Sequence, residues 1–253
     1  MRLIALGTGP AFPARGGATS GYLVTHDGTS LLMDCGTGVV SNLQKHLDFR
    51  AVSAIVISHM HADHFLDLIP YRYGLRYAPC GRTTGRIALH LPPGGFTVLR
   101  HVVAPFADEP ETFWEVFQVS EYDPGGALRV GGLTVRFAQT RHLMPAFAMS
   151  VEAAGQKLVY SADSAPSERL VALARGADLF LCEATLQRRE QDAPGGAHMT
   201  AAEAGAAAAH AGVGRLLLTH IWQEYDETQS VLQASDAFGG PVELAVENES
   251  YEV

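Results

Sequence analysis

The chain has 253 residues, of which 47% are hydrophobic and 18% are charged. This composition is typical of a globular protein with a sizeable core and excludes a disordered chain. The 18 basic and 27 acidic residues give a formal charge of −9, which argues against broad nucleic-acid binding through phosphate contacts.

The cysteines are few and widely spaced: Cys35, Cys80 and Cys182. No CxxC pair occurs, so the sequence indicates neither a disulfide framework nor a cysteine zinc site, and we expect reduced thiols. The first residues lack the long apolar core of a signal peptide, and no run of about 18 apolar residues follows. We therefore expect a soluble cytoplasmic protein.

In chain order, the first half predicts strands at residues 3–6, 21–25 and 30–33, a helix at 37–47, a strand at 54–58 and a helix at 63–77. A short strand at 87–91 precedes a less legible region that extends through residue 123. The second half predicts strands at 133–138, 146–151 and 157–160, a helix at 167–174, a strand at 179–182, a helix at 201–211, a strand at 215–219, a helix at 228–237 and a last strand at 242–246. Two similar halves without a linker indicate one α/β domain over 1–253, with two packed sheets and helices outside.

A dense set of metal ligands follows the apolar stretch 54–58: His59, His61, Asp63 and His64 lie within six residues. On an extended segment residues i and i+2 point the same way, so His59 and His61 can bind one ion. Asp63 and His64, past the bend, can face a second. This donor set suits Zn²⁺, Mn²⁺ or Fe. The alternative is a polar loop that is rich in histidine by chance.

Three further candidates each follow a predicted strand: His142, Asp163 and His220. Strand ends on one edge of a sheet meet at a single site. Taken alone, each of these residues could be an ordinary surface or hydrogen-bonded side chain. Together with the first run they form a set of seven ligands.

This pattern, an HxHxDH run followed by His, Asp and a final His on successive strand ends, resembles the metallo-β-lactamase superfamily over nearly the whole chain. The resemblance implies a four-layer αβ/βα sandwich with a dinuclear metal site between the two sheets. It assigns His59, His61 and His142 to the first metal, Asp63, His64 and His220 to the second, and Asp163 to both. It also implies that Asp34 orients the histidine cluster.

A narrower resemblance concerns residues 182–186 and 196–203, which are similar to two loops of the ribonuclease Z branch. It implies that Glu183 and His198 form a catalytic pair near the leaving group. Cys182 and Met199 depart from the branch pattern. Only 20 residues separate His142 from Asp163 and 19 separate Asp163 from Glu183, which leaves no room there for a long tRNA-binding arm. The alternative is that Glu183 merely ends a strand and His198 precedes a helix capped by Thr200.

We therefore expect a dinuclear hydrolase, with zinc as the first choice of metal, that acts on small or cyclic nucleotide phosphodiesters. Asp63 would help to orient the attacking water, and His198, held by Glu183, would protonate the leaving oxygen. The alternatives are a tRNA 3′-processing endoribonuclease, a carbonyl-directed hydrolase of the lactonase, thioesterase or β-lactamase type, a di-iron oxidoreductase and a non-enzymatic scaffold. A homodimer is plausible, and no membrane partner is expected.

Other polar and aromatic residues give weaker expectations. Arg141, and less so Arg15, could contact a substrate phosphate. Four aromatic residues could form a substrate lip or belong to the core: Phe113, Trp114, Phe117 and Tyr122. Five histidines without ligand spacing are expected on the surface or in packing: His26, His46, His90, His101 and His210.

Overall fold

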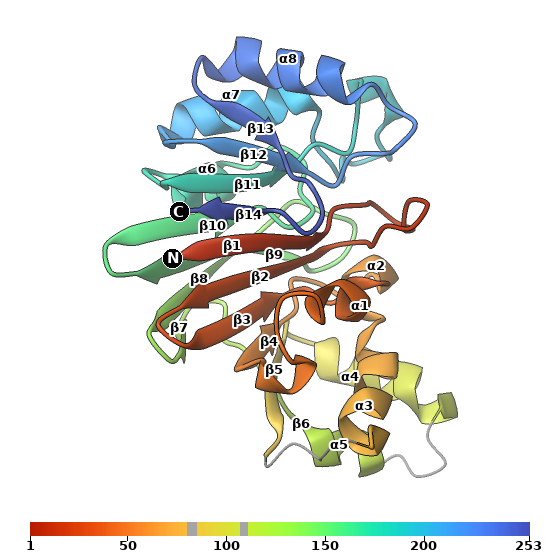
Figure 1. The fold of residues 1–253 in the computed structure, drawn as a ribbon. Coiled ribbons are helices and arrows are strands. Elements are labelled where there is room, and N and C mark those ends of the chain that lie inside the picture. Colours follow the sequence, from red (N-terminus) through yellow and green to blue (C-terminus); the bar gives the residue numbers. More distant parts are fainter. Residues whose placement is uncertain (80–84, 107–110) are drawn as a thin grey trace.

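A computed structural model describes residues 1–79, 85–106 and 111–253. These residues form two seven-stranded sheets, stacked face to face with helices on their outer faces (Figure 1). The first sheet runs in the order β14 (Ser250–Glu252), β1 (Arg2–Gly7), β2 (Gly21–His26), β3 (Thr29–Met33), β4 (Ala54–Val56), β5 (Ile87–Leu91) and β6 (Phe117–Glu121). The second runs β13 (Val242–Leu244), β12 (Leu216–Thr219), β11 (Leu179–Glu183), β10 (Gln156–Tyr160), β9 (Phe147–Ala153), β8 (Leu133–Gln139) and β7 (Ala127–Val130).

The helices divide between the two outer faces (Figure 1). Those beside the first sheet are α1 (Val39–Leu43), α2 (Ala62–Phe65), α3 (Leu68–Tyr77), α4 (Gly95–Val103) and α5 (Glu111–Val116). Those beside the second are α6 (Glu168–Ala174), α7 (Ala201–Ala211) and α8 (Glu227–Phe238). The predicted four-layer αβ/βα sandwich is confirmed.

Three apolar clusters fill the three interfaces between these four layers. Strand β1 shows how its sequence serves two of them, because successive side chains of a strand point to opposite faces. Leu3 and Ala5 pack between the sheets, whereas Ile4 and Leu6 pack beneath the helices of the first half. Because both faces of these strands are buried, they read as continuous apolar runs.

Several elements differ from the predicted ones. The predicted helix 63–77 is divided into α2 and α3, because the backbone N–H of Asp67 turns away to donate to the Cys35 carbonyl at 3.1 Å. The predicted helix 37–47 is shortened to α1, which begins only after Gly38, a left-handed residue with φ 91°. Strand β13 is not the last strand, since β14 follows and pairs with β1.

The suggestion that four aromatic residues form a substrate lip is wrong, and the alternative, that they belong to the core, is correct. Phe113, Phe117 and Tyr122 are 0%, 1% and 6% exposed. Trp114 is half-buried against the ring of Phe96. Cys35 and Cys182 are buried free thiols, whereas Cys80 lies outside the described residues. No helix within the described ranges is long and apolar enough to cross a membrane.

The strands that matter for function all end at one edge of the sandwich. Residues directly after β3 and β4 in the first sheet, and after β8, β10, β11 and β12 in the second, therefore approach one another across the gap between the sheets. Every residue of the predicted metal and catalytic set lies at or shortly after such a strand end or on the loop before α7.

Candidate metal centre

The seven predicted ligands come together in two groups whose ligand atoms lie within 4.8 Å of one another. The first group contains His59, His61, His142 and Asp163, and the second contains Asp63, His64 and His220.

Asp163 lies between the two groups and presents one oxygen to each. Its Oδ2 is 3.6 Å from Nε2 of His59 and 3.8 Å from Nε2 of His142. Its Oδ1 is 3.4 Å from Nε2 of His64 and 3.6 Å from Nε2 of His220. This is the geometry that a carboxylate shared by two cations requires.

Four imidazoles are oriented by hydrogen bonds on their outer nitrogen, Nδ1. His64 donates to Asp34 at 2.8 Å and His142 to the Ala197 carbonyl at 2.9 Å. His59 contacts the Ser58 hydroxyl at 3.0 Å and His220 the Thr185 hydroxyl at 2.8 Å. Because these contacts occupy Nδ1, it is Nε2 of each ring that faces the centre.

The arrangement fits metal ions and is hard to explain without them. Nε2 of His59 and Nε2 of His142 both lie 3.1 Å from Nδ1 of His61. Three imidazole nitrogens that converge in this way can share one cation among them. In the second group, Nε2 of His64 is buried and makes no hydrogen bond, although carboxylate oxygens of Asp63 and Asp163 each lie 3.4 Å from it. A metal ion bound between this nitrogen and the two oxygens would satisfy all three.

The charges of the site favour the forms that bind metal. Burial, reinforced by the charge of His64, lowers the pKa of His59 well below its usual range. Burial likewise lowers the pKa of His61 and of His142. Burial alone would raise the pKa of Asp163, but His220 and His64 outweigh it and lower that pKa. Neutral imidazoles and ionised carboxylates are the species that coordinate cations. His64 is the exception: burial would lower its pKa, but the surrounding aspartates outweigh burial and raise it well above its usual range, so a metal ion has to displace the proton of this ring.

Asp34 is the centre of a buried network beneath the second group. Its Oδ1 accepts from the Ser58 N–H at 2.7 Å, and its Oδ2 accepts from the Ser58 hydroxyl at 2.8 Å and the Tyr160 hydroxyl at 2.9 Å, in addition to His64. Asp34 adopts φ 59° and His220 φ 58°, both left-handed conformations that non-glycine residues rarely adopt. The surrounding contacts hold this backbone strain at the site.

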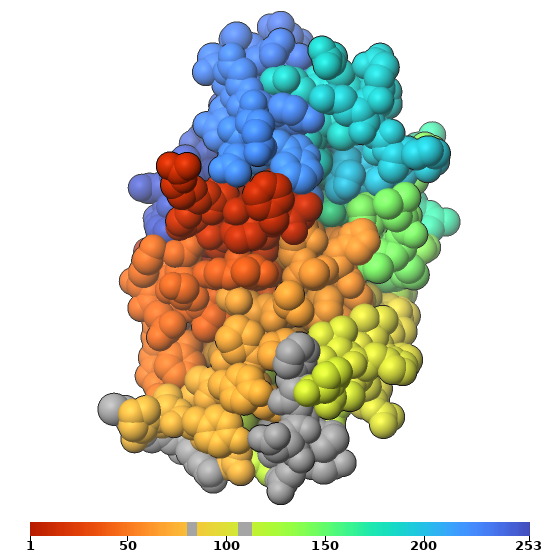
Figure 2. Space-filling model, turned by 90° about the vertical axis from the view of Figure 1, so that its right-hand side faces the viewer, coloured from red at the N-terminus to blue at the C-terminus, as the bar shows by residue number. Residues whose placement is uncertain are grey.

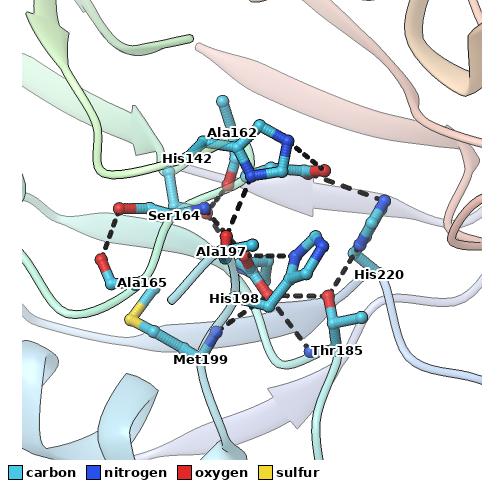
Figure 3. Close-up of polar contacts among 12 residues, drawn as sticks. His142, Ala162, Ser164, Ala165, Thr185, Ala197, His198, Met199 and His220 are labelled. Carbon is cyan, nitrogen blue, oxygen red and sulfur yellow. Dashed lines mark hydrogen bonds and ion pairs between the residues drawn. The ribbon is translucent and has the colours of Figure 1, made fainter. Parts of the chain in front are cut away.

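The Glu183 carboxylate, 1% exposed, ends β11 and receives the ring of His198. His198 Nδ1 donates to Glu183 Oε1 at 3.0 Å, and the other oxygen accepts from the Thr185 hydroxyl at 2.6 Å. Burial alone would lower the pKa of His198, but the Glu183 charge dominates and raises it to about 9. Figure 3 shows the His198 ring beside His142 and His220, with ring centroids 5.1 and 5.8 Å away.

The structure contains both the helix cap and the Glu183–His198 contact that the sequence predicted for this loop, whereas the catalytic role of the pair stays a prediction. Thr200 does cap α7, in a reciprocal capping box with Glu203. The same loop also directs His198 toward the ligand groups, since Asp163, His198 and His220 have ligand atoms within 4.8 Å of one another.

Sequence reasoning did not single out Ser58, Thr185 or Tyr160, which fix the ligands and Glu183. Their hydroxyl groups reach the site through contacts between distant segments, for which the local pattern carries no signal. Arg141 donates to the Gly195 carbonyl at 2.8 Å, on the loop that leads to His198, whereas Arg15 is exposed. A phosphate contact by either arginine stays a prediction.

Comparisons with known proteins agree with this architecture. A family model described as a beta-lactamase superfamily domain matches residues 29–221. The uncharacterized protein Rv1339 of Mycobacterium tuberculosis is 34% identical over 255 residues, which cover 100% of this chain and 92% of that protein.

Two further relatives carry functional names. The probable metallo-hydrolase YhfI of Bacillus subtilis is 31% identical, with 97% of each protein covered. Its crystal structure superposes with a TM-score of 0.87 at 27% identity and covers 99% of both chains. A ribonuclease Z of Ignicoccus hospitalis is 28% identical, with 92% of this chain and 91% of that protein covered.

Proposed function

Because the chain belongs to the beta-lactamase superfamily and is a metallo-hydrolase related to ribonuclease Z, we propose that it hydrolyses small or cyclic nucleotide phosphodiesters at a dinuclear centre. The observation that carries the proposal is the hydrogen-bonded pair Glu183–His198 beside the two ligand groups. A metal site alone would serve many hydrolytic reactions, whereas this pair adds a positioned proton donor.

His59, His61 and His142 would hold one divalent ion, Asp63, His64 and His220 the other, and Asp163 both, with zinc as the first choice and manganese or iron as alternatives. When bound, such ions supply Lewis acidity that activates water and offsets charge on the phosphoryl oxygens.

The side chains then divide the proton transfers between them. Asp63 is ionised, because His64 and His220 outweigh the effect of burial and lower its pKa. The backbone N–H of Ala11 donates to Asp63 Oδ2 at 2.8 Å and so fixes the position of this carboxylate. We assign to Asp63 the role of accepting a hydrogen bond from the attacking water. His198, protonated and held through Nδ1 by Glu183, donates its Nε2 proton to the departing alkoxide oxygen.

The proton donor suits an alkoxide leaving group, and the relatedness to ribonuclease Z favours a phosphodiester over an ester or lactone with the same leaving group. An alkoxide leaves a phosphodiester readily only when it is protonated, and His198 is charged at neutral pH. A small substrate is favoured because α6 and β11 occupy the chain between Asp163 and Glu183, without an arm that could bind a tRNA elbow.

A substrate panel under matched Zn²⁺ or Mn²⁺ loading tests the proposal: bis-p-nitrophenyl phosphate, 2′,3′-cyclic nucleotides, precursor tRNA and a lactone. We expect cyclic and linear phosphodiesters to be cleaved, and the His198→Ala variant to lose about 10²–10⁴-fold in kcat with unchanged metal content. The matched control His210→Ala, at an exposed histidine on α7, should behave as the wild type.

Two outcomes would contradict the proposal. One is a loaded wild-type protein that hydrolyses phosphodiesters no better than His61→Ala. The other is a loss in His198→Ala that is fully explained by lost metal.

A further inference from the structure

Two aromatic side chains lie on the loops that adjoin the metal-ligand groups, without belonging to an apolar cluster of the described residues. Phe12 is 50% exposed and Trp222 is half-buried, and their ring centroids are 5.6 Å apart at an interplanar angle of 52°. Figure 2 shows the loop that contains Phe12, in red, against the blue C-terminal segment on the surface of the molecule. Aromatic faces open to solvent beside a polar site are available to a ligand.

The pair is fixed to the site from both sides. On the Phe12 side, the neighbouring Ala11 donates its N–H to Asp63 Oδ2 at 2.8 Å. On the Trp222 side, the backbone N–H of His220 donates to the Thr8 carbonyl at 2.9 Å, which ties the two loops together. Each ring is therefore one or two residues from a group that contacts or forms the metal-ligand set.

The local backbone also points to a defined role. Ala11 has φ 48° and His220 has φ 58°, so a strained residue lies directly before Phe12 and another lies two positions before Trp222. Such strain persists where the surrounding structure has to present a group in one orientation. Here the groups presented are two π-faces on the loops that adjoin the metal-ligand groups.

We propose that the Phe12–Trp222 pair is a base-stacking platform, on which the nucleobase of the substrate lies while its phosphodiester faces the ligand groups. This inference rests on the proposed function. Every nucleobase has a π-face, so stacking binds bases without reading their sequence, and the larger purines gain the most contact. The inclined rings allow one face-to-face and one edge-to-face contact with the same base.

Paired substrates test the platform: 2′,3′-cyclic AMP, and glycerol 1,2-cyclic phosphate, which carries the cyclic phosphodiester without a base. We expect Phe12→Ala and Trp222→Ala each to lower the ratio of the two kcat/KM values by about 5- to 100-fold, mainly through KM for the nucleotide. Trp222→Phe should restore most of the ratio. The control Tyr77→Ala, at an exposed aromatic residue on α3, should not change it. An unchanged ratio in both platform variants overturns the inference.

A binding measurement separates the platform from the reaction. In a Trp114→Phe background Trp222 is the remaining tryptophan, and its fluorescence should be quenched by AMP but not by ribose 5-phosphate. Quenching by AMP in a protein that cleaves no phosphodiester contradicts the proposed function and leaves the platform standing. Turnover of cyclic nucleotides without quenching of Trp222 fluorescence by AMP overturns the platform. A protein that is a dimer as wild type and a monomer as Trp222→Ala overturns it as well.

Discussion

Glu183 Oε1 lies 3.0 Å from Nδ1 of His198, where the loop before α7 passes the end of β11. The same oxygen accepts the Ser164 N–H at 2.7 Å, and the other oxygen accepts from Thr185 and from the Met199 N–H at 3.2 Å. The carboxylate therefore cannot turn away from the imidazole without breaking several buried hydrogen bonds. It is a fixed charge that sets both the orientation and the protonation of the ring.

The first prediction concerns the pH dependence of Glu183→Gln. Only protonated His198 can donate a proton, so activity falls as the pH rises through its pKa, which Glu183 raises to about 9. Without this charge the pKa falls toward the ordinary histidine value of about 6.5, and the alkaline fall in kcat moves to lower pH. A pH–rate profile measures the shift. Glu190→Gln, an exposed residue of the same loop, is the control; identical profiles for both variants would contradict the role of Glu183.

The second prediction concerns Thr185, whose hydroxyl donates to Glu183 and contacts His220 Nδ1 at 2.8 Å. Thr185→Val keeps the shape of the side chain and removes both contacts, so His220 loses its orienting partner. We expect metal affinity at the second group to fall about 10- to 100-fold. Titration against a chelator of known affinity measures it. Thr185→Ser retains the hydroxyl and should retain the affinity; equal affinities in all three proteins would refute the link.

The third prediction concerns the stability of the metal-free protein. In Asp34→Asn an amide replaces the carboxylate that accepts from Ser58, Tyr160 and His64. The NH₂ group of this amide is itself a donor, so it cannot accept from the donors that it faces. We expect the free energy of unfolding to fall by about 1–3 kcal/mol, and by about 1 kcal/mol in Tyr160→Phe. Urea unfolding measures both. Asp236→Asn, at an exposed site on α8, should be neutral; an equally small effect at Asp34 would show that its network contributes little.

The sequence could predict that the seven candidate ligands come together, because most of them follow an apolar strand within a few residues. In β4, β10 and β12 the buried run stops and a ligand appears within a few residues, so the local pattern contains both the strand and the site. The fold class followed from the same regularity, because two halves with strands and intervening helices bury their apolar runs only between layers.

What the sequence could not predict depends on contacts between distant segments. Tyr160 reads as one more apolar strand residue until its hydroxyl is seen to reach Asp34, 126 residues away. The sequence pattern around Phe113 and Phe117 is the same whether the two side chains line a substrate lip or pack in the core. Strands β7 and β14 each bury only one residue, so they lack the apolar run that identifies the other strands.

The fourth prediction concerns metal removal, which leaves Nε2 of His64 buried without a hydrogen bond and the three imidazoles of the first group in mutual repulsion. A chelator should therefore lower Tm, and Zn²⁺ or Mn²⁺ should restore it. An ion present at 100 times its Kd stabilises the fold by about 2.7 kcal/mol, which corresponds to a shift of about 5–10 °C for a domain of this size. Differential scanning calorimetry with and without metal gives the shift. In His64→Ala it should shrink, because the second group has lost a ligand, whereas the exposed His210→Ala should keep the full shift. A wild-type protein whose Tm is the same with chelator and with metal would show that the two groups do not bind ions in the folded state.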